Sequence, residues 1–168
     1  MKSISLIGFM GAGKTVVGQA LSERLDLPFL DLDQEIERIE GKSVYRIFAE
    51  EGEGYFRRRE WEVLQNLHEG DLILSVGGGA FTIDDNINLI NSRSFSVWLD
   101  CPIEVCIRRC AATAHERPLF SDPFELAKLY KHRLKYYKKA HYRIDSRSDS
   151  PSEIANRIIQ IIEAEESR

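Results

Sequence analysis

A glycine-rich segment near the start of the chain carries the strongest chemical pattern in the sequence. It runs from Gly8 to Thr15 and matches G-x-x-x-x-G-K-S/T at every fixed position. Glycines let the backbone curl so that successive N–H groups face phosphate oxygens, and the helix that follows adds the positive end of its dipole. Lys14 can then reach the β- and γ-phosphates, and Thr15 can ligate Mg²⁺. The pattern predicts nucleoside triphosphate binding by Gly11, Ala12, Gly13, Lys14, Thr15 and Val16; the weaker alternative is a strand–helix turn that binds no ligand.

Two carboxylates, Asp31 and Asp33, stand at the end of the second apolar run. Phosphate-binding loops of this type are normally accompanied by an aspartate on another core strand that helps to hold Mg²⁺. The third apolar run, residues 71–76, ends in glycine instead. Alternation along a strand places Asp31 and Asp33 on one side, beside the phosphate loop. One carboxylate can then serve the metal and the other can accept a hydrogen bond from an attacking hydroxyl. Alternatively, Asp33 is the N-cap of a helix from Gln34 to Glu40.

Three consecutive glycines, Gly77 to Gly79, end the third apolar run. At the carboxyl end of a strand, such a run lets a ligand approach the backbone closely, so that its amides can face a phosphate or a substrate oxygen. The alternative is a tight loop whose residues need positive φ angles.

Arginine is bunched at residues 57–59, 108–109, 117 and 133 of a chain whose net charge is −4. Such clusters are either solvated helix faces or groups that converge on a small anion, and composition leaves both interpretations open. We expect Arg58 and Arg59 to be solvated side chains.

Apolar runs of strand type alternate with segments of helical spacing along the whole chain. Alternating strands and helices imply parallel pairing with right-handed crossovers, and therefore a three-layer α/β/α fold. A polar stretch without periodicity, residues 111–124, is typical of a mobile loop, and nothing in the sequence marks a linker, so we expect a single domain over residues 1–168. The predicted strands are 3–7, 29–32, 71–76, 94–99 and 142–144; the predicted helices start at 15, 34, 102, 125 and 151, with one or two more between 41 and 66.

The composition excludes several classes of protein. Hydrophobic residues make up 43% and charged residues 30% of the 168 positions, as in an ordinary globular domain. The net charge disfavours nucleic acid as a partner. No stretch approaches the apolar length of a membrane span, and the first residues lack the apolar segment of a signal peptide, so we expect a cytoplasmic protein without membrane contact. The odd number of cysteines, Cys101, Cys106 and Cys110, does not suggest disulfides, and no second cluster supplies the ligands of a metal site, so we expect buried or half-buried thiols.

Taken together and in order, these motifs resemble the shikimate kinase family. The resemblance covers essentially the whole chain, and it is specific because neighbouring kinase families share the phosphate loop but not the combination. The departures are modest: Phe120 stands where an aliphatic residue is common, and the region 145–151 keeps only an aspartate and a proline. The matching motifs are Gly8-x-x-Gly-x-Gly-Lys-Thr15, Asp31-x-Asp33, Phe56-Arg57-x-x-Glu60, Gly77-Gly78-Gly79, Arg117-Pro118-Leu119 and Arg133-x-x-x-Tyr137.

The resemblance implies a P-loop fold of the nucleoside monophosphate kinase type with a five-stranded parallel sheet. It implies transfer of the γ-phosphate of ATP to the 3-hydroxyl of shikimate, with Mg²⁺ as cofactor, on the route to chorismate and the aromatic amino acids. ATP and shikimate are then the partners, and we expect a monomer.

The resemblance also assigns roles to individual residues. Lys14, Asp33 and Arg117 are implied to be catalytic, with Asp33 binding the reacting hydroxyl and Arg117 closing over the phosphoryl group from the lid at 111–124. Thr15 and Asp31 are implied to support the metal, and Arg109 and Pro151 to contact the nucleotide. The implied shikimate-binding residues are Asp33, Arg57, Glu60, Gly78, Gly79 and Arg133.

These roles agree with the chemistry of the residue types, because a planar guanidinium binds a carboxylate with two hydrogen bonds. Phosphoryl transfer needs positive groups such as Lys14, Mg²⁺ and Arg117. Two alternatives remain at this point: a kinase for another acceptor, such as gluconate or a nucleoside monophosphate, and a nucleotide-binding domain without catalysis.

Overall fold

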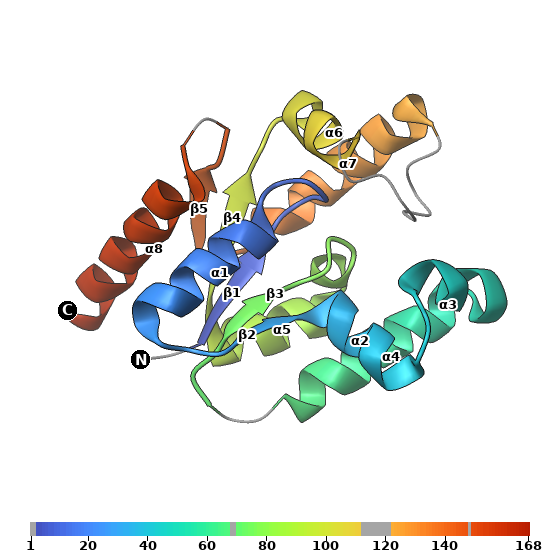
Figure 1. The fold of residues 1–168 in the computed structure, drawn as a ribbon, viewed down its shortest axis with the longest axis horizontal. Coiled ribbons are helices and arrows are strands. Elements are labelled where there is room, and N and C mark those ends of the chain that lie inside the picture. Colours follow the sequence, from blue (N-terminus) through green and yellow to red (C-terminus); the bar gives the residue numbers. More distant parts are fainter. Residues whose placement is uncertain (1–2, 68–69, 112–121, 148) are drawn as a thin grey trace.

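The computed structural model describes residues 3–67, 70–111, 122–147 and 149–168. Five strands pair in parallel into one sheet with the order β2-β3-β1-β4-β5 (Figure 1). The three-layer α/β/α prediction with a five-stranded parallel sheet is confirmed. The strands are β1 (Ser3–Ile7), β2 (Phe29–Asp31), β3 (Ile73–Ser75), β4 (Ser94–Asp100) and β5 (Tyr142–Asp145).

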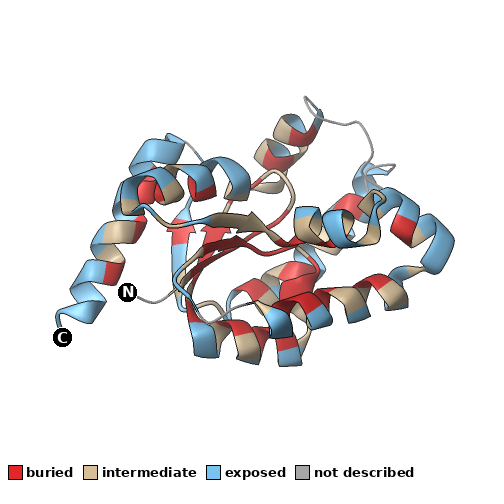
Figure 2. Cartoon of the chain, turned by 60° about the horizontal axis from the view of Figure 1, so that its bottom comes forward, coloured by how far each residue is buried: buried red, intermediate tan, exposed pale blue. Residues whose placement is uncertain are grey.

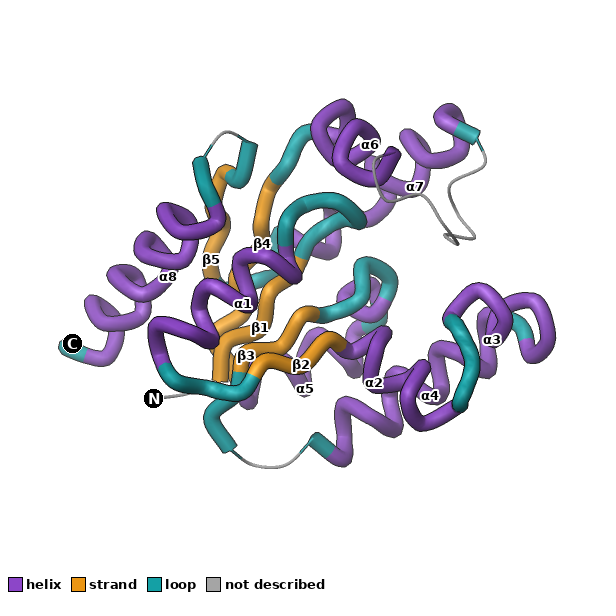
Figure 3. Tube along the Cα trace, viewed as in Figure 1, coloured by secondary structure: helices purple, strands orange, loops and turns teal. Residues whose placement is uncertain are grey.

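The described ranges contain eight helices and one 3₁₀ turn, of which all but the last helix lie between strands, and each predicted helix is present. Three helices, rather than a single crossover, separate β2 from β3, and they form a lobe beside the carboxyl ends of the strands (Figure 3). The helices are α1 (Lys14–Leu25), α2 (Leu32–Glu40), α3 (Val44–Glu51), α4 (Glu53–Asn66), α5 (Asp84–Arg93), α6 (Ile103–Ala111), α7 (Pro123–Tyr137) and α8 (Pro151–Glu166), with the 3₁₀ turn η1 at Ala80–Thr82.

The central strand β1 decides where a ligand can bind. It pairs with β3 on one side and β4 on the other, with Ile4 opposite both Ile73 and Phe95. Strands β2 and β3 therefore lie on one side of β1, and β4 and β5 lie on the other. The loops that follow the strands diverge at such a position, and they leave a crevice at the carboxyl ends of the strands. The phosphate loop follows β1 directly, so the fold places it at the mouth of this crevice.

Helices cover both faces of the sheet and bury it. Helices α1 and α8 pack together on one face, and α5 lies on the other (Figure 1). Figure 2 shows buried residues concentrated in the strands and on the inner sides of the helices. Helix α1 approaches the sheet closely because Gly18 has no side chain: a Cβ there would overlap the ring of Phe29. The core thus holds α1, and with it the phosphate loop, in a fixed position.

Capping residues set where several helices begin. Asp122 accepts a hydrogen bond from the N–H of Phe124 and starts α7, two residues before the predicted position. Ser150 and Glu153 form a reciprocal capping box at the start of α8, with Pro151 at its first position as the sequence predicts. The predicted lid at 111–124 falls mainly on residues 112–121, which lie outside the described residues. In the described part of the chain, no helix combines the length and the apolar character needed to cross a bilayer.

Candidate active site

A cavity of about 510 Å³ opens at the carboxyl ends of the strands. Segments that are far apart in sequence meet around it: the phosphate loop, the ends of β2 and β3, helix α4, and single residues of α6 and α7. All the predicted site residues line it except Arg117, which lies outside the described residues, and Pro151, an exposed residue at the start of α8. The predicted residues that line the cavity are Gly11, Ala12, Gly13, Lys14, Thr15, Val16, Asp31, Asp33, Arg57, Glu60, Gly78, Gly79, Arg109 and Arg133.

The phosphate loop has the backbone shape that its glycines predict. Gly11 and Gly13 adopt positive φ angles of 80° and 100°, which residues with side chains rarely adopt. Gly13 is the N-cap of α1, so the N–H groups of the first turn face the cavity without a side-chain cap. Lys14 folds back over the loop and donates from Nζ to the carbonyl of Gly8 at 2.5 Å. The loop is thus a preformed cradle of N–H donors with one ammonium group beside it.

The structure corrects the interpretation of the two aspartates. Strand β2 ends at Asp31 and helix α2 already begins at Leu32, so Asp31 and Asp33 do not alternate along one strand. Asp31, not Asp33, is the N-cap: its Oδ1 accepts from the N–H of Gln34 at 3.1 Å. Asp33 lies within the first turn of α2 and turns toward the glycine run, where its Oδ1 would be 2.8 Å from a Cβ on Gly77. Both carboxylates still line the cavity.

The glycine run is required by close packing rather than by backbone strain. None of Gly77, Gly78 and Gly79 has a positive φ, so the alternative that sequence left open is wrong. A Cβ on Gly79 would overlap the guanidinium of Arg57, and one on Gly78 would lie 2.8 Å from Nη1 of Arg133. The run is therefore bare so that two arginines, one from α4 and one from α7, can lie against its backbone.

Arg57 and Glu60 form a shielded ion pair within α4. Arg57 Nη1 donates to Glu60 Oε2 at 2.7 Å, and its Nη2 reaches Glu53 at 3.3 Å. The side chain of Glu60 is only 1% exposed, and its Oε1 has no hydrogen-bond partner within the described residues. Burial raises the pKa of Glu60 to about 7, against the opposing attraction of Arg57. At neutral pH, Glu60 is thus poised between its charged and neutral forms.

Arg133 is buried, which local sequence does not predict. The residue is 5% exposed, and its guanidinium lies 5.6 Å from the ring centre of Phe9 in the phosphate loop. Tyr137, one helical turn further along α7, is fully buried and donates its hydroxyl to the carbonyl of Gly78 at 2.8 Å. Burial raises the pKa of Tyr137, so it stays a neutral donor. This tyrosine ties the glycine run to the helix that carries Arg133.

Arg109 projects from α6 to the opposite end of the cavity. Its Nη1 donates to the carbonyl of Gly11 at 3.2 Å, and its Nη2 donates to the carbonyl of Ser146 at 3.3 Å. The residue is half-buried. It therefore links the phosphate loop to the segment that follows β5.

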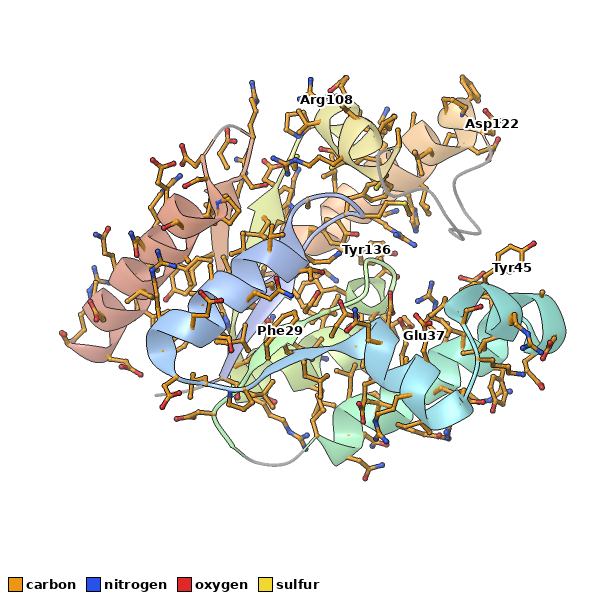
Figure 4. The ribbon with its side chains drawn as sticks, viewed as in Figure 1. Phe29, Glu37, Tyr45, Arg108, Asp122 and Tyr136 are labelled. Atoms are coloured by element: carbon orange, nitrogen blue, oxygen red, sulfur yellow. The ribbon has the colours of Figure 1, made fainter. Side chains whose placement is uncertain are left out.

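Sequence reasoning passed over several residues that line the cavity. Glu37 lies one helical turn after Asp33 on α2 (Figure 4), and that spacing is the signal that could have revealed it. Arg59, expected to be solvated, instead binds Glu40 and Glu62, while Arg58 is exposed as predicted. The apolar wall of the cavity carries no sequence signal because its members read as ordinary core residues; it consists of Phe9, Val44, Phe48 and Phe56.

The phosphate loop follows the central strand of a sheet with the order 2-3-1-4-5, and carboxylates and arginines surround one cavity beside it. These features define a P-loop kinase of the nucleoside monophosphate kinase type. A family model described as shikimate kinase matches residues 10–163. The chain belongs to the shikimate kinase family.

Individual relatives agree with this assignment. The chain is 40% identical to shikimate kinases of Persephonella marina and Aquifex aeolicus, over 95% of its own length and 98% and 95% of theirs. Among solved structures, a shikimate kinase from Acinetobacter baumannii in complex with shikimate has a TM-score of 0.93 and 37% identity, covering 100% of this chain and 96% of the other. A deoxyadenosine kinase from M. mycoides, 13% identical with a TM-score of 0.65 over 94% of this chain and 99% of its own, shares the fold alone.

Proposed function

We propose that this protein transfers the γ-phosphoryl group of ATP to the 3-hydroxyl of shikimate, giving shikimate 3-phosphate and ADP on the route to chorismate and the aromatic amino acids. The observation that carries the proposal is the placement of two guanidinium groups, those of Arg57 and Arg133, against the bare glycine run in the same cavity as the phosphate loop. A small acid held there by its carboxylate presents its hydroxyls toward the phosphates.

The phosphate loop is the donor end of the site. Its N–H groups bind the phosphates of ATP, and Lys14 moves from the carbonyl of Gly8 to the β- and γ-phosphates when the nucleotide binds. The guanidinium of Arg109 donates hydrogen bonds from its edge to two backbone carbonyls. These bonds fix the orientation of the guanidinium plane, so that its face can stack on the adenine. We also propose that Arg117, which lies outside the described residues, reaches the transferring phosphoryl group, and that Pro151, which does not line the cavity, contacts the bound nucleotide from the start of α8.

The glycine run and the two arginines are the acceptor end. Arg57 and Arg133 bind the shikimate carboxylate, and the backbone of Gly78 and Gly79 contacts the ring hydroxyls. Glu60 holds Arg57 in place at 2.7 Å. Asp33 accepts a hydrogen bond from the attacking hydroxyl, because its carboxylate lies at the glycine run on the side of the cavity that α2 provides.

The residues present fit a magnesium ion. Thr15 and Asp31 both line the cavity and offer a hydroxyl and a carboxylate oxygen, the ligand type that Mg²⁺ prefers. Within the described residues there is no cluster of three or more histidine, cysteine or acidic side chains that would form an all-protein metal cage. This agrees with an ion that takes most of its ligands from phosphate and water. When bound, Mg²⁺ neutralises phosphate charge.

The remaining parts of the proposal concern the state of the protein. Three buried free thiols suit a reducing compartment, so we place the protein in the cytoplasm. We propose a single domain that works as a monomer with ATP and shikimate as its partners, without nucleic acid or membrane. Sedimentation of the purified protein tests the oligomeric state.

A coupled ADP-release assay tests the function. We expect release that depends on shikimate and that collapses in Asp33→Asn. The control Glu35→Gln changes a carboxylate on the same helix that pairs with the exposed Arg38 and does not line the cavity, and it should keep wild-type activity. Release that is independent of shikimate, or that gluconate or a nucleoside monophosphate supports equally well, would overturn the acceptor assignment.

A further inference from the structure

Three cysteines that the proposed reaction does not use lie together behind the phosphate loop. Cys101 directly follows β4, and Cys106 and Cys110 lie on α6, beside the loop between β1 and α1 (Figure 1). All three are buried free thiols, 2%, 1% and 1% exposed. Their position close to the nucleotide end of the cavity gives them a route to affect its chemistry.

Cys101 and Cys106 are neighbours in the structure. Cys106 Sγ donates to the backbone oxygen of Cys101 at 3.7 Å. A disulfide brings two sulfurs to about 2 Å, so the Cys106 sulfur has to turn from the backbone of Cys101 to its sulfur to be joined.

The two thiols differ in acidity in the way that a disulfide-forming pair requires. The neighbouring thiol of Cys106 and the charge of Arg109, whose Nη1 lies 3.7 Å from the Cys101 sulfur, lower the pKa of Cys101 to about 7. The neighbouring thiol of Cys101 and burial raise the pKa of Cys106. Cys101 is therefore the nucleophile at neutral pH, since the thiolate is the reactive form, and Cys106 is the protonated neighbour.

Arg109 connects this pair to the phosphate loop. The same Nη1 that faces the Cys101 sulfur donates to the carbonyl of Gly11. The loop also packs tightly against α6, because a Cβ on Gly11 would lie 2.5 Å from the carbonyl oxygen of Cys106 and 2.9 Å from the sulfur of Cys110. A movement of the Cys101 or Cys106 sulfur would therefore displace the Arg109 guanidinium or the backbone at Gly11.

We propose that Cys101 is an oxidation site, at which a peroxide produces a reversible Cys101–Cys106 disulfide that weakens nucleotide binding through Arg109 and the phosphate loop. The effect on nucleotide binding rests on the proposed function, whereas the disulfide itself does not.

The chemistry balances with hydrogen peroxide as the oxidant. The Cys101 thiolate attacks one peroxide oxygen, an S–O bond forms, the O–O bond breaks, and the departing hydroxide takes a proton to become water. The Cys106 sulfur then attacks the Cys101 sulfenic acid, so that an S–S bond forms and the S–O bond breaks. The second hydroxide takes the Cys106 proton and leaves as water. Sulfur has lost two electrons to the peroxide, and a dithiol such as dithiothreitol reverses the change by exchange.

The disulfide is tested on the wild-type protein by mass spectrometry. Treatment with hydrogen peroxide should remove two hydrogens from the intact protein, and peptide mapping should place the bond between Cys101 and Cys106. ATP should slow the reaction several-fold, because the nucleotide covers Arg109. In Cys106→Ser, a dimedone-type reagent should trap the sulfenic acid at Cys101, whereas Cys110→Ser should oxidise like the wild type. Oxidation at Cys110, or no oxidation of Cys101, would overturn the proposal.

Kinetics separate this proposal from the proposed function. The oxidised protein should show a KM for ATP raised roughly tenfold, as expected for the loss of one charge-assisted hydrogen bond, with the KM for shikimate unchanged and full recovery after dithiothreitol. Cys101→Ser should keep the reduced activity and lose the response to peroxide. An unchanged KM for ATP in a fully disulfide-bonded sample would overturn the link to the nucleotide. Inactivity of the reduced protein with shikimate would instead count against the proposed function.

Discussion

Replacing Glu60 with glutamine should change how the stability of this protein depends on pH. Glu60 projects from α4 toward the glycine run, and burial raises the pKa of its carboxyl group from 4.5 to about 7 even though Arg57 binds it at 2.7 Å. Glutamine has nearly the same shape and can still accept a hydrogen bond from Arg57, but it does not titrate. The variant therefore isolates the cost of ionising this buried carboxyl group.

The sign and size follow from the two pKa values. Between about pH 4.5 and 7 the folded protein holds a proton at Glu60 that the unfolded chain has lost, so rising pH lowers the free energy of unfolding. The stabilisation is fully present below the unfolded pKa and is lost as pH passes the folded pKa. At about 1.4 kcal/mol for each tenfold change in proton affinity, the loss amounts to about 3 kcal/mol. As pH rises, the free energy of unfolding of Glu60→Gln should increase by this amount relative to that of the wild type.

Urea denaturation of both proteins from about pH 5 to about pH 8 measures the effect. The matched control is Glu62→Gln, on the same helix but with a side chain 49% exposed and paired with Arg59, and its stability curve should run parallel to that of the wild type. If the difference between Glu60→Gln and wild type stays constant over this range, Glu60 is ionised throughout and the argument from burial is refuted.

Three further substitutions test other parts of the site. Gly79→Ala places a methyl group on the Arg57 guanidinium and should raise the KM for shikimate at least about tenfold while leaving ATP binding intact; equal KM values would show that Arg57 has room to move. Asp31→Ala removes the N-cap of α2 and should cost about 1 kcal/mol of stability, measured by thermal unfolding, in addition to any change in the Mg²⁺ requirement. Lys14→Met should lower kcat by about 100-fold or more with little change in fold by circular dichroism, and a kcat close to wild type would remove Lys14 from the transfer step.

The phosphate loop shows where sequence reasoning is strongest. Its chemistry depends on backbone N–H groups, glycine φ angles and one lysine, all encoded within eight consecutive positions, Gly8 to Thr15. The strand and helix on either side are equally local, because β1 is a short apolar run and Pro28 limits α1. A local motif in a local context was therefore sufficient to predict this half of the site and its place in the fold.

The aspartate pair shows where such reasoning fails. The sequence pattern allowed β2 to continue through Leu32, which led to the wrong expectation that Asp31 and Asp33 share one strand face. The alternative, that Asp33 is the N-cap of the following helix, is also wrong. Helix α2 begins at Leu32, two residues before the predicted start at Gln34, because Asp31 satisfies the N–H of Gln34. A boundary shift of this size is invisible to periodicity, yet it decides which carboxylate is tied to the backbone.

By itself, the sequence determined the alternation of strands and helices, the phosphate loop and the order of the motifs, because each depends on neighbouring residues. Tertiary structure decided the rest of the site. Arg133 reads as a surface residue on a lysine-rich helix, and only the packing of α7 against the phosphate loop buries it. The purpose of the glycine run likewise becomes visible only when Arg57 and Arg133 arrive from two helices. Burial and convergence depend on contacts between distant segments, and a pattern of nearby residues does not contain them.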